Sequence, residues 1–307
     1  RIINISTNLT VNTNYCFICI DGHYVCIKLT AKDELLMIKF CSLYSGSTGN
    51  SLFVESDNSK ILIDSGVSSK KVVDGLNSIG VDINTIDAIL VTHEHSDHVQ
   101  SLGTISKKFD IPVYANQKTW DAMKNQRDKI SDNNIKFFNN NENFEIGDFT
   151  IHPFDIPHDA ANPCGFTFLC DKEKFSIATD LGHMTNNVMS CLEGSKFLML
   201  EANYDPEVLK CSRYPYLLKT RIAGPNGHLS NNLAGKTISH LINCGLETAI
   251  LGHLAKENNF PELAYNTVSE ELAMSNYSKD SIGLHVASRD CPSDVLEITP
   301  TLQARVG

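Results

Sequence analysis

Five apolar, strand-like runs in this sequence each end in an aspartate or a histidine. The runs are ILID, AILVTH, FDIPH, FSIATD and TAILGH, and they end at Asp64, His93, His158, Asp180 and His253. When the strands of a sheet end at the same edge, they hold such side chains together on a rigid base. The sequence therefore predicts a sheet-based fold with metal-ligand side chains gathered at one edge.

One of these strand ends is followed at once by further ligands. The stretch HEHSDH places His93, His95, Asp97 and His98 within six positions. Clustered imidazoles and carboxylates bind divalent cations well and add little to an apolar core. In extended backbone, His93 and His95 point to the same side and can share one ion. Asp97 and His98 follow a turn, which can direct them to a second ion.

Strand ends elsewhere in the sequence supply the further ligands that two such ions would need. His158 is the best-placed third nitrogen ligand for the first ion, and His253 would complete the second site. A carboxylate must bridge the cations and lower their repulsion, and Asp180 fits this role. Asp64 precedes a Ser-Gly pair, so it is either a simple turn former or an outer partner that fixes a ligand histidine.

The rest of the chain alternates strand and helix patterns from Met37 onward. Apolar spacing predicts helices over 68–80 and 231–245, and strands recur before and after them. We see no internal repeat and no low-complexity linker, so residues 37–307 are expected to form one mixed α/β domain.

Residues 1–36 differ in character from the remainder of the chain. Asp21 and Gly22 lie between two alternating apolar runs, which predicts a hairpin. We expect the segment to be an extension of the working domain, and an overextended reading frame is one explanation. A zinc site is an alternative for this segment, although the spacing matches no common zinc module; its ligands would be Cys16, Cys19, His23 and Cys26.

Composition limits the binding partners and the cellular compartment that we expect for the chain. The net charge of -10, from 26 basic and 36 acidic residues, argues against a broad electrostatic grip on nucleic acid, although a local basic groove stays open. The ten cysteines follow no regular framework, so we expect them to be reduced. No run approaches the roughly 20 apolar residues of a membrane span, and the start shows no secretion signal. We expect a cytoplasmic protein without membrane association, and the sequence leaves its oligomeric state open.

A resemblance emerges from these motifs. HEHSDH, with ILIDSG ahead of it and His158, Asp180 and His253 behind it, resembles the pattern of metallo-β-lactamase-fold hydrolases, H-x-H-x-D-H followed by His, Asp and His. The segments SLYSGSTGNS, YPYLLKTRIAGPNGHLSN and LGHLAKENN are similar to the YycJ/WalJ-type branch, which lies near ribonuclease Z and the phosphodiesterase PhnP. One departure is Ala255, where the branch usually has serine, and this places only an outer contact in doubt.

The resemblance implies a fold, a cofactor and an activity. The fold would be a four-layer αββα sandwich, and the site would hold two divalent ions, zinc or manganese. The activity would be DNA exonuclease activity. A water shared by two cations roughly 3.5–4 Å apart has its pKa lowered from 15.7 toward about 7, so a hydroxide could attack a phosphodiester. The positive charge left after Asp97 and Asp180 would stabilise the charge that develops.

A general acid is needed because an alkoxide leaves poorly. Glu201 ends the run KFLMLE and His228 precedes a helix, and both resemble the Glu and His that ribonuclease Z-like enzymes pair outside the metal ligands. A carboxylate-supported imidazole would be kept protonated for this step. The alternative is a solvated strand end and a helix cap.

Two segments are candidates for binding substrate phosphate. SGSTGN offers Ser45, Ser47, Asn50 and a run of backbone amides, although the same stretch suits a tight hairpin. Lys219 and Arg221 could clamp a phosphate, or they could form an exposed pair.

Three classes of function are compatible with the sequence. The first is a phosphodiesterase acting on nucleic acid, above all a DNA exonuclease; the 72 residues between Asp180 and His253 are too few for the inserted domain of roughly 100 residues that β-CASP nucleases carry there. The second is an acyl hydrolase of the glyoxalase II or lactonase type, which the Glu201 and His228 pair disfavours. The third is a non-catalytic metal-binding regulatory protein, which is disfavoured because every expected ligand is present. Hydrolysis of β-lactams is least favoured for a cytoplasmic chain.

Overall fold

The computed structural model describes the backbone of residues 15–20, 23–28 and 37–298. Side chains are described for residues 37–298 apart from Lys279. Within these ranges, no helix has the length and apolar character that crossing a bilayer requires.

Two compact units make up the chain, Arg1–Leu36 and Met37–Gly307. In the first unit, β1 (Tyr15–Ile20) and β2 (His23–Lys28) pair in antiparallel register, which confirms the predicted hairpin. The side chains of the alternative zinc ligands lie outside the described residues; these are Cys16, Cys19, His23 and Cys26.

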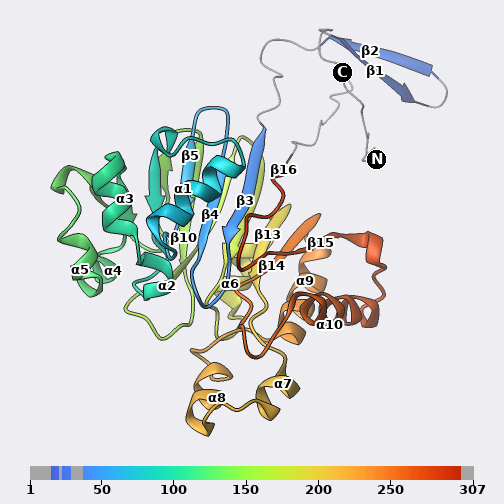
Figure 1. Ribbon diagram of the computed structural model, residues 1–307. Coiled ribbons are helices and arrows are strands. Elements are labelled where there is room, and N and C mark those ends of the chain that lie inside the picture. The colour runs from blue at the N-terminus through green and yellow to red at the C-terminus, as the bar shows by residue number, and fades with distance from the viewer. Residues whose placement is uncertain (1–14, 21–22, 29–36, 299–307) are drawn as a thin grey trace. The chain divides into compact units, whose positions relative to one another are not determined.

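The second unit contains two seven-stranded sheets (Figure 1). The first sheet has the strand order β16-β3-β4-β5-β6-β7-β8. In this sheet, β5 to β8 are parallel, whereas β3, β4 and β16 are antiparallel to their neighbours. Parallel neighbours end at the same edge, so the residues after β5 and β6 lie side by side. The bounds are β3 (Ile38–Tyr44), β4 (Ser51–Glu55), β5 (Lys60–Ile63), β6 (Ala88–Leu90), β7 (Val113–Ala115), β8 (Ile135–Phe137) and β16 (Leu296–Ile298).

The second sheet has the order β15-β14-β13-β12-β11-β10-β9. Strands β12 to β15 are parallel, and β10 runs in the same direction because β11 is antiparallel to both β10 and β12. The ends of β10, β12, β13 and β14 therefore share one edge. The bounds are β9 (Phe144–Ile146), β10 (Phe149–Asp155), β11 (Cys164–Cys170), β12 (Glu173–Ala178), β13 (Phe197–Glu201), β14 (Thr248–Gly252) and β15 (Gly283–Val286).

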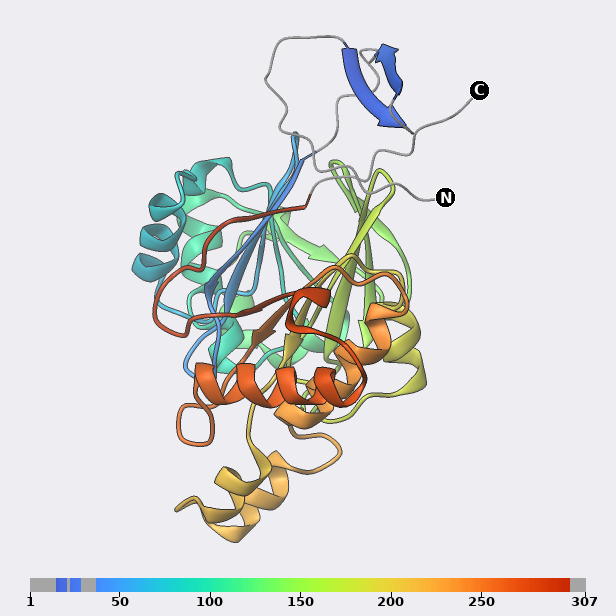
Figure 2. The same cartoon turned by 90° about the vertical axis from the view of Figure 1, so that its right-hand side faces the viewer.

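Helices cover the outer faces of both sheets, which confirms the predicted αββα sandwich. Figure 2 shows α1 and α3 on one side of the strands and α6 and α9 on the other, while α7 and α8 project beyond the layers. Helix α10 packs against α9 and β15. The bounds are α1 (Ser69–Ser78), α2 (Ser96–Val99), α3 (Leu102–Phe109), α4 (Gln117–Ala122), α5 (Lys124–Arg127), α6 (Asn186–Leu192), α7 (Pro206–Cys211), α8 (Tyr216–Ile222), α9 (Asn231–Ile242) and α10 (Pro261–Met274), with short 3-10 turns at η1 (Ile83–Thr85), η2 (Asp132–Asn134) and η3 (Lys279–Ser281).

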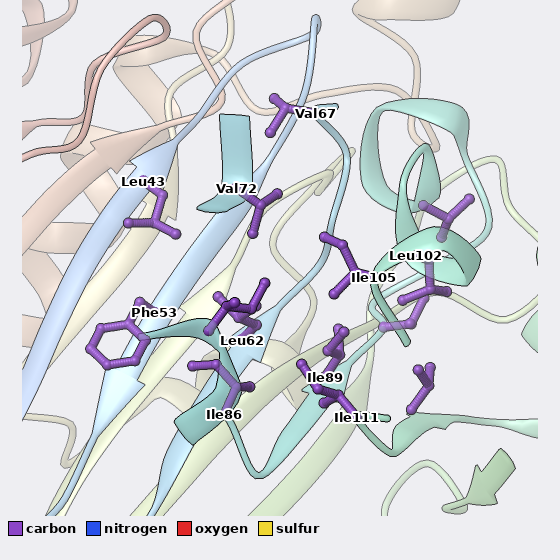
Figure 3. Packing of buried hydrophobic residues seen from close by; sticks show 14 of the residues in the cluster. Leu43, Phe53, Leu62, Val67, Val72, Ile86, Ile89, Leu102, Ile105 and Ile111 are labelled. Carbon is purple, nitrogen blue, oxygen red and sulfur yellow. The ribbon is translucent and has the colours of Figure 1, made fainter. Parts of the chain in front are cut away.

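The core consists of apolar layers on both sides of each sheet. Leu62 of β5 and Ile89 of β6 pack with Val72 of α1 and Ile105 of α3 in one buried cluster (Figure 3). An equivalent cluster joins β12 to β14 with α6, α9 and α10. Between the sheets the packing is aromatic, since the ring centroids of Phe40 and Phe197 lie 4.7 Å apart. Burial of such side chains fixes the two sheets, and hence their edges, relative to each other.

Three residues near strand ends have left-handed backbone. The φ angles are 63° at Asp64, 59° at Asp180 and 54° at His253. Aspartate and histidine are among the few non-glycine residues enriched in this conformation. Since a left-handed residue cannot continue a strand, β5 and β14 end directly before Asp64 and His253, and β12 ends two residues before Asp180.

Candidate metal centre

The structure brings His93, His95 and His158 together, and we name these residues the first ligand group. One ring nitrogen of each lies within 4.8 Å of the others. His93 Nε2 faces His95 Nδ1 at 3.1 Å, and the His158 ring lies 5.1 Å from that of His93. His93 follows β6 of one sheet and His158 follows β10 of the other. The group therefore joins the edges of the two sheets.

Neighbouring groups orient two of these rings. Thr92 Oγ1 donates to Asp64 Oδ2 at 2.8 Å and can accept from His93 Nδ1 at 3.0 Å. His158 Nδ1 donates to the carbonyl of Gly227 at 3.0 Å. Each Nδ1 is thus used within the protein, which leaves each Nε2 free to bind a cation.

Asp97, His98 and His253 form a second cluster, which we name the second ligand group. Their ligand atoms also lie within 4.8 Å of one another. His98 Nδ1 donates to Asp64 Oδ2 at 2.7 Å, and His253 Nδ1 donates to Glu201 Oε1 at 2.8 Å. Both imidazoles of this group are held by buried carboxylates, in contrast to those of the first group.

Backbone contacts fix Asp97 in this group. Asn50 N donates to the Asp97 carbonyl at 2.8 Å, and Gly66 N donates to the Asn50 carbonyl at 2.8 Å. A Cβ atom at Gly66 would lie 1.6 Å from the Asp97 carbonyl oxygen. Only glycine allows this approach, so the turn after β5 sets the position of α2 and its carboxylate.

Asp180 lies between the two groups, where the sequence predicts a bridging carboxylate. Its oxygens are 3.2 Å from His98 Nε2 and 3.7 Å from His158 Nε2. The side chain is buried and follows β12. One carboxylate therefore contacts both ligand groups, which is the geometry that two neighbouring cations require.

The two groups differ in their proton affinities. Burial, together with the charge of His98, holds the pKa of His93 well below its usual value, and burial also lowers the pKa of His158. Burial opposes protonation of His253 as well, but the charge of Asp180 and hydrogen bonds outweigh it and raise the pKa to about 10. The carboxylates of Asp180 and Asp64 likewise raise the pKa of His98 against the effect of burial.

The donor set fits divalent cations. Among the described residues, His158 Nε2 and His253 Nε2 are buried nitrogens with no hydrogen-bond partner. Leaving a buried polar atom unpaired is costly, so such atoms indicate a missing partner. Six imidazole or carboxylate side chains, with Asp180 as a shared seventh, form a donor set suited to divalent cations.

Glu201 and His228 form a pair beside the second ligand group. His228 Nδ1 donates to Glu201 Oε1 at 2.7 Å, and the Glu201 Oε2 atom accepts from the backbone amides of Leu181 and Leu229. Burial opposes ionisation, but the charge of His228 and hydrogen bonds lower the pKa of Glu201 to about 2. Glu201 in turn raises the pKa of His228 against the effect of burial. Glu201 thus holds His228 and the ligand histidine His253 with one oxygen, a double role that the sequence did not reveal.

The candidate phosphate residues of the SGSTGN stretch differ in position. Ser45 is buried, and its Oγ accepts from the backbone amide of His253 at 2.8 Å. Asn50 Oδ1 accepts from Gly46 N at 2.9 Å, and its Nδ2 lies 3.1 Å from His98 Nε2. Ser47 is exposed. The contacts of Ser45 and Asn50 position the second ligand group from within the protein.

Lys219 and Arg221 both lie on α8. Lys219 Nζ donates to the carbonyl of Lys210 at 2.7 Å. Arg221 Nε donates to Asp159 Oδ2 at 2.6 Å, and the other Asp159 oxygen lies 3.4 Å from His158 Nε2. Arg221 is therefore connected to the first ligand group through Asp159.

Sequence reasoning missed Thr92, Asp159 and the Gly227 carbonyl. Thr92 precedes HEHSDH directly, and Asp159 follows His158 directly, so adjacency to a ligand was the available signal for both. Gly227 contributes through its backbone, and no side chain could have marked it.

Comparison with known proteins places the chain in a family. The family model for the beta-lactamase superfamily domain matches residues 59–254. The exodeoxyribonuclease WalJ of Streptococcus pneumoniae is 36% identical over 240 residues, which cover 78% of this chain and 89% of WalJ. The exodeoxyribonuclease YycJ of Bacillus anthracis is 37% identical over 235 residues, which cover 76% of this chain and 89% of YycJ.

Solved structures show the same fold. A diphosphatase of the PhnP family superposes with a TM-score of 0.61 at 17% identity, covering 87% of this chain and 100% of that protein. The short form of human tRNase Z gives a TM-score of 0.56 at 13% identity, with 84% and 98% covered. The chain belongs to the beta-lactamase superfamily, as a metallo-β-lactamase-fold hydrolase of the branch that contains WalJ and YycJ.

Proposed function

We propose that this hydrolase is a DNA exonuclease that cleaves phosphodiester bonds with two divalent cations. The observation that carries the proposal is the Glu201 and His228 pair, joined at 2.7 Å beside the ligand groups. This pair can protonate an oxygen leaving group, and phosphodiester cleavage requires such a protonation. The names of the relatives support DNA as the substrate, since both WalJ and YycJ are exodeoxyribonucleases.

In this proposal each ligand group holds one cation. His93, His95 and His158 hold the first, the second ligand group holds the other, and Asp180 contacts both. Zinc or manganese bound there would lower the pKa of a water and offset the negative charge of the phosphate. The described residues around the site then orient the ligands, with Asp64 on His98 and Glu201 on His253.

His228 is proposed as the general acid. Its side chain is 20% exposed, so a substrate can reach it, whereas Glu201 is fully buried. The Glu201 carboxylate accepts a hydrogen bond from Nδ1–H of His228, so the proton on Nε2 is the one available for transfer to the departing oxygen. Burial opposes protonation of His228, but the Glu201 carboxylate outweighs it and raises the pKa, which favours the protonated ring.

The domain boundary and the compartment are parts of the same proposal. We assign the hydrolase domain to residues 37–307 and treat residues 1–36 as an extension. A cytoplasmic location is supported by the cysteines of the described residues, because those at 41, 164, 170, 191, 211, 244 and 291 are all free.

One assay series tests the proposal. The purified protein, supplied with manganese or zinc, is offered bis(p-nitrophenyl) phosphate, 5′-phosphorylated DNA, a thioester and a β-lactam. We expect cleavage of both phosphodiesters and its loss in Asp97→Ala. Turnover of the thioester alone would replace the proposal with acyl hydrolysis, and no turnover of any substrate would favour a metal-binding regulatory protein.

A further inference from the structure

Helices α7 and α8 enclose a pocket outside the layers of the sandwich. Both helices project beyond the sheets in Figures 1 and 2. The pocket has a volume of about 620 Å³. Its walls are Tyr204, Pro206, Leu209, Lys210, Tyr214, Tyr216, Lys219, Thr220 and Ala223.

The pocket combines aromatic and cationic side chains. Three tyrosines line it, of which Tyr216 is 79% exposed. Lys219 donates to the carbonyl of Lys210 across the wall, so its ammonium group is positioned and keeps further protons to donate. Tyrosine faces together with lysines are the surface on which unpaired nucleobases stack while the neighbouring phosphates meet positive charge.

Hydrogen bonds connect the pocket to the metal centre. Tyr204 forms a parallel bridge with Ser230, and Asn203 N donates to the Leu229 carbonyl. The side chain of Asn203 donates to the carbonyl of His253 at 2.8 Å. The segment that ends at Tyr204 therefore lies against the loops that carry His228 and His253. Tyr204 in the pocket wall is thus adjacent in the chain to Asn203, which contacts the loop of the ligand histidine His253.

We propose that the pocket between α7 and α8 binds an unpaired nucleobase of the DNA strand whose phosphodiester is cleaved. This inference rests on the proposed function and adds the part of the substrate that it recognises. A single-stranded end is required, because a paired base cannot enter a side pocket without leaving its stack. The stretch from 206 to 223 thereby acts in substrate selection.

The first test compares a single-stranded oligonucleotide with one that lacks the terminal bases but keeps the sugar-phosphate chain. For the wild-type protein, we expect a KM roughly tenfold or more lower for the strand with bases. Tyr216→Ala should raise the KM for that strand toward the value for the abasic strand, and Tyr216→Phe should restore it. Phe137→Ala, which removes a 50% exposed aromatic ring from β8, is the matched control and should behave as wild type.

The second test measures binding without catalysis. An oligonucleotide carrying 2-aminopurine near its end is titrated with protein in the absence of added metal, and stacking should quench its fluorescence. Tyr214→Ala and Tyr216→Ala should each lose the quenching, while circular dichroism checks that they fold. Equal wild-type KM values for both strands, or quenching that survives in both variants, would overturn the inference. Quenching without any cleavage of DNA would instead overturn the proposed nuclease activity and leave the pocket assigned.

Discussion

The two ligand groups are built from similar residues but are held in different ways. In the first group, His93 and His158 are oriented by a hydroxyl and a backbone carbonyl, and burial keeps their pKa values low. In the second group, His98 and His253 are each held by a buried carboxylate, and their pKa values are raised. Without metal, burial favours the neutral forms of His93 and His158, whereas the neighbouring carboxylates favour the charged forms of His98 and His253.

This contrast shows that the residues around each ligand group, more than the ligands themselves, set the pKa values of its imidazoles. A neutral imidazole such as that of His93 can accept a cation without losing a proton, whereas a protonated imidazole in the second group must release one. The carboxylates behind the second group also add negative charge that favours a bound cation. We therefore expect the two positions to differ in their response to mutation and to pH.

The largest expected effect is a fall in activity when one ligand of either group is removed. Asp97→Ala and His95→Ala should each lower kcat/KM for bis(p-nitrophenyl) phosphate by roughly 1000-fold or more, since both cations act on the same phosphate. Metal analysis by mass spectrometry should show one ion lost per chain in each variant. Wild-type turnover in either variant would remove that group from the reaction.

His228→Ala is expected to slow the cleavage of substrates with poor leaving groups more than that of substrates with good ones. Without the general acid, cleavage of DNA should fall by roughly 100- to 10,000-fold. Bis(p-nitrophenyl) phosphate releases a stable phenolate, so its cleavage should fall by less than about tenfold. Steady-state kinetics on both substrates measure the difference. Equal losses on the two substrates would mean that His228 supports the second ligand group rather than the leaving oxygen.

Asp64→Asn tests the carboxylate support of the second group, because Asp64 contacts His98 directly but reaches His93 only through the Thr92 hydroxyl. Loss of the charge behind His98 should weaken binding of the second cation by roughly 10- to 100-fold and affect the first cation less. Isothermal titration calorimetry with zinc resolves the two binding events. Asp82→Asn, at an exposed turn that caps η1, is the control and should titrate as wild type. If Asp64→Asn weakened both events equally, the two groups would not be independently supported.

The smallest expected effect is the release of protons when metal binds. Metal binding should release more protons from the second group than from the first, because the pKa values of His98 and His253 are raised whereas those of His93 and His158 are lowered. Affinity for the second cation should therefore rise with pH toward about 10, the pKa of His253. Because that pKa is raised in the folded protein, its protonation stabilises the metal-free fold, and this contribution is lost as pH rises through about 10. A pH indicator in weak buffer measures the release, and equal release by both groups would contradict the contrast.

The convergence of the candidate ligands could be predicted because it follows a rule of sheet geometry. Asp180 and His253 follow parallel strands, so apolar runs ending in ligands were enough to bring them together. The strand over 88–93 was predicted too long, since β6 ends at Leu90. Beyond it, the backbone amide of Thr92 donates to Asp64 Oδ1 at 2.9 Å instead of to a neighbouring strand. A local run of letters does not show such a competing contact.

The parts that sequence reasoning missed depend on tertiary contacts. Strands β8, β9 and β16 have three residues each, too few for a periodic pattern. Helix α10 (Pro261–Met274) was missed although its three buried positions, Ala264, Val268 and Leu272, recur at the helical spacing of four residues. The double role of Glu201 needs His228 and His253 to meet one oxygen, which only the folded chain shows.

The left-handed backbone at Asp64, Asp180 and His253 restricts what could ever replace these residues. A β-branched side chain there would add strain on the order of 1–3 kcal/mol, whereas glycine would relieve strain but remove a candidate ligand at 180 or 253, or the carboxylate that holds His98 at 64. The residues that can occupy these positions are thereby limited both by the chemistry of the side chain and by the backbone conformation. A glycine variant that is inactive but harder to denature would reveal how much folding stability this family gives up to keep its catalyst.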